Sequence, residues 1–169
     1  MQALPEHTIV FTSLKDGSHQ FHYRLGPDFF LACGDEDLLG GEAGVDVDLE
    51  KANHLLVARI HVQGLARMLC DHCNAPMDQP VEGEQRQIFK LTGAEETDED
   101  ELVSLDSGAH EINLTHYIYE CLRLHLPIRH VHPPGQCDPE VTKVLDKALV
   151  NHEPDPRWAK LNQLKNKGA

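Results

Sequence analysis

The chain has 169 residues, which suits one domain with a substantial core. It is 40% hydrophobic and 25% charged, as globular proteins usually are, and it contains no apolar run near the roughly 20 residues that span a bilayer. The net charge of −13 argues against a module that binds nucleic acid through the phosphates. Five cysteines and an N-terminus without a signal-peptide pattern predict reduced thiols in a cytoplasmic protein.

The first part of the chain carries strand signals. Residues 8–14, "TIVFTSL", are rich in β-branched side chains, and residues 20–25, "QFHYRL", alternate between apolar and polar side chains. The Asp16-Gly17 pair between them favours a turn, so the two segments are predicted to form a β-hairpin. Pro27 then favours the start of a short helix.

A second hairpin is predicted around a CxxC motif. In residues 45–50, "VDVDLE", apolar and acidic residues alternate, which predicts a strand with one buried and one solvated face. Another strand is expected to begin at residues 55–62 and to run towards Cys70, and residues 81–91 are expected to pair back with it. Cys70 and Cys73 would then lie at the tip of the hairpin.

Residues 93–107 are predicted to form an acidic loop. Six acids and no base lie within residues 93–101, and their mutual repulsion should keep the segment extended. A solvated loop is the simplest interpretation. A site for a cation or for a basic partner is the alternative.

Two helices are predicted in the C-terminal half. Residues 111–127 place apolar side chains at helical spacing, and Pro127 ends the pattern. A second helix is expected over residues 140–152, with Asp138 as its N-cap and Pro139 at its first position.

We therefore predict a single α+β domain over residues 1–150. It would consist of an antiparallel sheet or open barrel in the N-terminal half, with two to three C-terminal helices packed on it. Residues 151–169 would form a proline-punctuated basic tail. Its last 13 residues carry four bases and no acid, so these 13 residues are +4 and the rest of the chain is −17.

The cysteine and histidine spacing predicts a metal site. Zinc takes four nitrogen or sulfur ligands in a tetrahedron, and a two-residue gap lets both thiolates of a CxxC turn bind one ion. A downstream loop rich in proline and glycine supplies the other half. The predicted ligands are Cys70, Cys73, His132 and Cys137, with His130 or His72 as substitutes for His132. Metal-free thiols and a dithiol redox pair remain the alternatives.

Sequence motifs for catalysis are missing. The chain has no GxSxG, no HExxH and no glycine loop of the phosphate-binding kind. Four protein ligands would leave no open position on a zinc ion, which favours a structural metal and a protein that is not an enzyme. Cys33 and Cys121 lie in apolar surroundings and are predicted to be buried.

Several segments together resemble one family. They are "CDHCNAPM", the acidic stretch, "EINLTHYIYECLRLHLPIRHVHPPGQC" and the terminal "DPRWAKLNQL". The combination resembles the YceD family of bacterial large-ribosomal-subunit RNA accumulation proteins. In that family a CxxC lies on a β-hairpin and is followed by an acidic linker, a helix with a glutamate ahead of an L-x-L-P signature, a His/Cys loop and a short C-terminal segment.

The resemblance carries over onto particular residues. Three groups match, namely the CxxC pair, the helix signature and the C-terminal segment: Cys70 and Cys73; Glu120, Leu124, Leu126 and Pro127; Asp155, Pro156, Arg157, Trp158 and Leu161. The chain departs from the pattern where many relatives carry a second CxxC, because here His132 and Cys137 stand in that place.

The family resemblance implies a ribosome-biogenesis factor that supports accumulation or processing of large-subunit ribosomal RNA. The expected partner is a ribosomal protein or a large-subunit assembly intermediate, with indirect contact to the RNA and none to a membrane. The candidate partner-binding residues in the basic tail are Arg157, Trp158, Lys160 and Lys165. A metal-dependent hydrolase or nuclease acting on precursor RNA, or a thiol-redox protein, are the alternatives.

Overall fold

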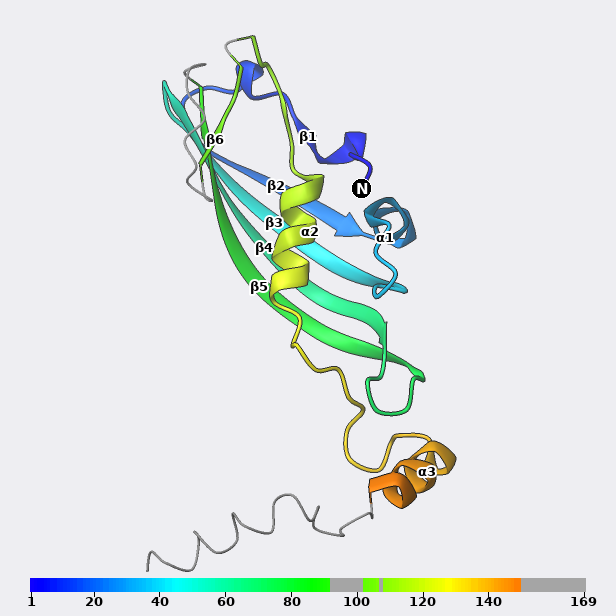
Figure 1. Cartoon of the computed structure of the whole chain (residues 1–169). Helices are drawn as coiled ribbons and strands as arrows, with labels where there is room; N and C mark the ends of the chain where they lie inside the picture. The colour runs from blue at the N-terminus through cyan, green and yellow to red at the C-terminus, as the bar shows by residue number, and fades with distance from the viewer. Residues whose placement is uncertain (92–101, 107, 150–169) are drawn as a thin grey trace, which may run out of the picture.

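The structure is a computed structural model that describes residues 1–91, 102–106 and 108–149. Its centre is a five-stranded sheet in the order β2 (Gly17–Leu25), β3 (Gly40–Lys51), β4 (Leu55–Leu69), β5 (Pro76–Lys90) and β6 (Leu102–Ser104). Neighbouring strands are antiparallel except for β5 and β6, which are parallel. The sheet curves strongly but does not close into a barrel (Figure 1).

Strand alternation gives the sheet one buried face. In β3, Val45, Val47 and Leu49 are buried, while the acidic residues between them are exposed, as predicted. Ile60 and Val62 continue the buried face on β4. Because side chains point to opposite faces with a period of two, this pattern fixes the register of the long β3–β4 pairing.

Two helices cover the buried face (Figure 1). α1 (Pro27–Cys33) contributes Phe29 and Phe30 to the core, and α2 (Thr115–Leu124) contributes Ile118, Cys121 and Leu122. The predicted α+β class is confirmed. α3 (Pro139–Leu149) is different, since it stands beyond the tip of the β4–β5 hairpin and packs no described side chain fully into the core.

The N-terminal hairpin prediction is wrong. β1 (Thr8–Ile9) pairs with β7 (Ile112–Asn113), and a 3-10 turn, Phe11–Ser13, follows it. Residues 17–25 instead form β2 and pair with β3 along their whole length. The longer antiparallel partner offers more ladder hydrogen bonds than a two-residue strand can, so the Asp16-Gly17 turn does not close a hairpin.

Two further boundaries differ from expectation. β5 begins at Pro76 rather than at residue 81, because the β4–β5 ladder continues to the Leu69–Pro76 pair. β6 lies inside the predicted acidic loop of residues 93–107. Residues 93–101 and 107 lie outside the described residues. Within the described ranges, no helix combines the length and hydropathy needed to cross a membrane.

Candidate metal centre

The tip of the β4–β5 hairpin is a tight turn closed by backbone hydrogen bonds. The N–H of Asn74 donates to the carbonyl of Cys70 (2.8 Å), and the N–H of Cys70 donates to that of Ala75 (2.9 Å). Asn74 has a φ of 56°, a left-handed conformation that asparagine tolerates better than most residues. The turn places both Cys70 and Cys73 on its inner side, where each is buried.

A second turn presents the other half of the site. After α2 ends, the N–H of Gln136 donates to the carbonyl of Pro133 at 3.0 Å, and Gly135 has a φ of +83°. These are features of a type II turn, which needs glycine at this position. His132 precedes the turn and Cys137 follows it. The carboxylate of Asp138 then caps α3 by accepting from the N–H of Glu140 (2.8 Å), as predicted.

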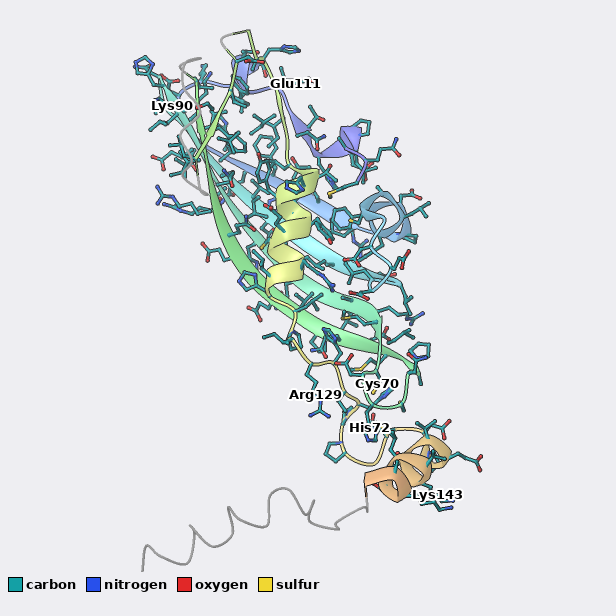
Figure 2. All side chains as sticks on the ribbon, in the orientation of Figure 1. Cys70, His72, Lys90, Glu111, Arg129 and Lys143 are labelled. Atoms are coloured by element: carbon teal, nitrogen blue, oxygen red, sulfur yellow. The ribbon has the colours of Figure 1, made fainter. Side chains whose placement is uncertain are left out.

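Hydrogen bonds fasten the two turns to each other. The N–H of Asp71 donates to the carbonyl of His130 (2.7 Å), and the N–H of His130 donates to the carboxylate of Asp71 (2.7 Å). His130 is therefore used for alignment, and His132, two residues on, lies beside the thiols. Figure 2 shows Cys70 and His72 at the hairpin tip, between the loop that carries Arg129 and helix α3.

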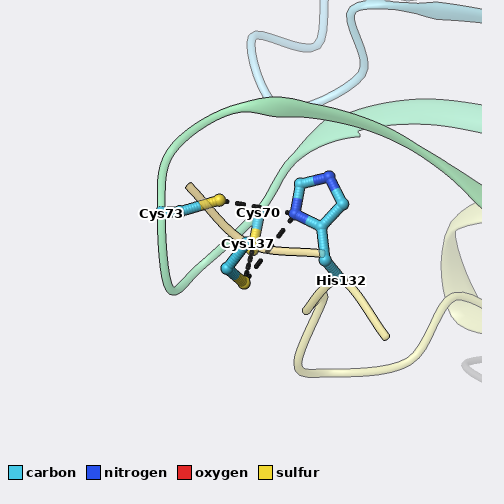
Figure 3. Close-up of side chains that lie close together, drawn as sticks. All are labelled: Cys70, Cys73, His132 and Cys137. Atoms are coloured by element: carbon cyan, nitrogen blue, oxygen red, sulfur yellow. Dashed lines mark hydrogen bonds between the residues drawn. The ribbon is translucent and has the colours of Figure 1, made fainter. Parts of the chain in front are cut away.

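Cys70, Cys73, His132 and Cys137 converge, with their ligand atoms all within 4.8 Å of one another (Figure 3). Cys70 Sγ lies 3.9 Å from Cys137 Sγ. His132 Nδ1 lies 3.4 Å from Cys73 Sγ and 4.0 Å from Cys137 Sγ. We call these four residues the four-ligand cluster.

The four-ligand cluster fits a tetrahedral metal ion. With zinc–sulfur bonds near 2.3 Å and zinc–nitrogen bonds near 2.0 Å, the edges of a tetrahedron are about 3.8 Å between sulfurs and about 3.5 Å between sulfur and nitrogen. The separations in the cluster are close to these values. The residues could therefore hold a metal ion with small side-chain adjustments.

The comparison with family models matches residues 58–165 to the family described as large ribosomal RNA subunit accumulation protein YceD. The chain belongs to the YceD family. The match begins within β4 and includes the CxxC hairpin, α2 and all four residues of the cluster. No curated protein and no solved structure matches the chain.

Hydrogen-bond donors make the cluster of this YceD-family chain favourable for thiolates. Burial opposes ionisation of Cys70, but backbone N–H groups of His132, Cys73 and His72 lower its pKa to about 5. The N–H of His72 lies 3.4 Å from Cys70 Sγ. The pKa of Cys73 is also lowered, chiefly by the backbone N–H of Asp138. Thiolates are the forms that bind metals.

The pKa values of the other two ligands, Cys137 and His132, are raised. Partial burial and hydrogen bonding with Cys70 and Cys73 raise the pKa of Cys137 to about 11. The pKa of His132 is raised by its hydrogen bond to Cys70 and by the negative charge of both thiols. Three thiolates at such distances would repel each other. A divalent cation would offset this repulsion, and its binding would displace the protons of those ligands that are still protonated.

The other residues singled out in the sequence lie outside the four-ligand cluster or outside the described residues. Cys33 and Cys121 are buried in the core, as predicted, and lie outside the four-ligand cluster. The tail residues Arg157, Trp158, Lys160 and Lys165 lie outside the described residues. Sequence reasoning missed the aligning role of Asp71. Its place inside a CxxC turn was the available signal, because a carboxylate there can reach the chain that supplies the other ligands.

Proposed function

We propose that this protein is a non-enzymatic ribosome-biogenesis factor that supports accumulation or processing of large-subunit ribosomal RNA. Membership in the YceD family carries this proposal, because the family is described by that role. The matched segment contains the hairpin, α2 and the four-ligand cluster, so the features named here belong to the part of the chain that defines the family.

A structural zinc ion in the four-ligand cluster is part of the proposal. The donor set of three sulfurs and one imidazole nitrogen is typical of structural zinc sites. With all four positions taken by protein, no position is left for a water or a substrate. The ion would instead join the β4–β5 hairpin to the loop between α2 and α3, in addition to the hydrogen bonds between Asp71 and His130.

The net negative charge of the chain favours a basic protein over bare RNA as its partner. The chain carries 28 acids against 15 bases, so phosphate contacts would meet net repulsion. A basic ribosomal protein, alone or within an assembly intermediate, would be attracted and oriented by the acidic surface. The basic tail with Arg157, Trp158, Lys160 and Lys165 would contact the RNA or the particle, so that RNA contact is indirect for the domain itself.

The role is tested by depleting the protein in cells that make it. We expect large-subunit ribosomal RNA to fall relative to small-subunit RNA, and the protein to co-sediment with large-subunit precursors on a gradient at low salt. An unchanged RNA ratio, together with sedimentation only as free protein, would contradict the proposal.

The metal is tested with purified, untagged protein. We expect one zinc per chain by elemental analysis, lost in Cys70→Ser and in Cys137→Ser but retained in the control Cys33→Ala, which removes a buried thiol outside the cluster. Two other results would support the alternatives. RNA cleavage that depends on added magnesium or manganese would indicate a nuclease, and a reversible Cys70–Cys73 disulfide in metal-free protein would indicate a redox role.

A further inference from the structure

A groove beside α1 combines apolar walls with an acidic rim. It lies between α1 and the first residues of β3, reaches β4 and β5, and encloses about 750 Å³. Its apolar lining consists of Phe30, Leu31, Leu38, Leu39 and Leu65. Its charged lining consists of Asp28, Asp35, Glu42, Arg67 and Asp78.

Three of the five apolar side chains of the groove are open to solvent, whereas Phe30 and Leu38 are buried. Leu31 is 81% exposed, Leu39 48% and Leu65 46%. Single exposed apolar residues are common on protein surfaces, but several grouped in one hollow indicate a binding surface. The three leucines come from a helix, a loop and a strand, and only the fold brings them to one place.

Close packing at Gly41 holds two walls of the groove together. Gly41 has a φ of +149°, and a Cβ there would lie 2.3 Å from the carbonyl oxygen of Leu65 and 2.8 Å from Cζ of Phe30. A side chain at Gly41 would therefore force apart the strand and the helix that form the walls.

The acidic groups of the rim differ in whether a cation is paired with them. Arg67 is occupied by Asp78, with Nε 2.9 Å from its carboxylate. Asp35 accepts a hydrogen bond from the Tyr119 hydroxyl (2.8 Å) and pairs with Arg123, whose Nε lies 3.4 Å from its carboxylate. Among the described residues, no cation lies within ion-pair distance of the Asp28 or Glu42 carboxylate.

We propose that this groove docks a basic segment of a partner protein. An apolar side chain of the segment would lie against Leu31, Leu39 and Leu65, and flanking lysine or arginine residues would face Asp28 and Glu42. Burial of the leucines would provide affinity, while the unpaired carboxylates would select positive charge. RNA fits poorly, because its phosphates would meet the same carboxylates. This inference rests on the proposed assembly role and locates the surface that such a role requires.

Peptide binding to the full-length, zinc-saturated protein tests the groove. The probe is a short fluorescein-labelled peptide of Lys-Arg-Leu-Gly repeats, measured by fluorescence anisotropy at low salt. We expect it to bind at least about tenfold more tightly than peptides in which serine replaces leucine or glutamate replaces both bases. Equal binding of the serine peptide would overturn the proposal, because attraction by charge alone would then explain the affinity.

Matched variants locate the binding surface. Leu31→Ser and Glu42→Lys should each weaken binding about tenfold, since they change the groove at exposed positions that the core does not need. The controls are Ile128→Ser, fully exposed elsewhere, and Glu50→Lys, on the same strand outside the groove, and both should stay within about twofold. Equal losses in variants and controls would refute the assignment.

An RNA competitor separates the two classes of ligand. If a single-stranded RNA oligonucleotide bound more tightly than the peptide and lost affinity in Leu31→Ser, the groove would be an RNA surface and the proposal would be wrong. Failure of peptide binding would refute the groove alone, since the RNA ratio after depletion reports separately on the proposed function.

Discussion

The contact between Gly83 and His125 provides a sharp test of how α2 is seated on the sheet. A Cβ at Gly83 of β5 would lie 2.1 Å from Cγ and 2.4 Å from Nδ1 of His125. The ring is held there by a hydrogen bond from Nδ1 to the carbonyl of Cys121 (2.8 Å). Gly83→Ala must therefore displace the ring and break that bond at the end of α2.

The expected cost follows from these contacts. Loss of the hydrogen bond costs about 1 kcal/mol, and strain from shifting the ring adds about 1 kcal/mol, against a gain of about 0.5 kcal/mol from replacing glycine within a strand. We expect Gly83→Ala to lower the free energy of unfolding by about 1.5 kcal/mol. His125→Ala alone should lose about 1 kcal/mol, because it removes the bond but also the obstacle. The double variant should therefore lose only about 0.5 kcal/mol, far less than the sum of about 2.5 kcal/mol.

Urea denaturation followed by far-UV circular dichroism, with zinc in excess, measures these values. Gly44→Ala is the matched control, because a Cβ on that strand glycine would have only the Gln63 carbonyl near it, at 3.9 Å. It should be neutral or slightly stabilising. Additive losses in the double variant, or a stabilising Gly83→Ala, would refute the close packing of His125 on the strand.

Three further predictions concern the site and the core. His7 is buried, and burial lowers its pKa below the usual 6.5, so unfolding takes up a proton between the two pKa values. The free energy of unfolding should therefore decline as the pH falls below about 6.5 and level off beneath the folded-state pKa. Urea midpoints measured across this pH range should show the decline, and His7→Leu should lack it. Asp71→Ala should weaken zinc affinity about tenfold in a chelator competition while keeping one zinc per chain, because it loosens the loop that supplies His132; unchanged affinity would contradict the aligning role. Ile118→Ala should cost about 2–5 kcal/mol in urea denaturation, since Ile118 is fully buried between α2 and the sheet, and a cost below about 1 kcal/mol would show that α2 is packed loosely.

The sequence correctly predicted the elements that have a local pattern in the chain. The alternation of Val45, Val47 and Leu49 with acids predicted β3, and helical spacing within residues 111–127 predicted α2. The CxxC at a hairpin tip followed from the two strands around it. Each pattern depends on residues that are neighbours in the chain, where periodicity directly reflects which face is buried.

Pairings between distant segments were not predictable in the same way. Thr8–Ile9 was expected to pair with the next strand but pairs with Ile112–Asn113. The carbonyl of Leu4 and the hydroxyl of Thr8 both accept hydrogen bonds from the Asn113 side chain, which helps to hold this distant pairing. The choice between possible partners depends on which strand offers more contacts once the sheet has formed, and no local pattern records it.

The sequence by itself indicated the fold class, the family and the three candidate cysteine ligands, because these depend on residue types and short spacings. It left His132, His130 and His72 as competing ligands. Only the tertiary structure decided among them, by bonding the backbone of His130 to Asp71 so that His132 is the imidazole that reaches the thiols. The groove at Leu31 and Leu65 was likewise decided by the fold alone. Its walls come from elements far apart in the chain, and only their packing fixes the distance between them.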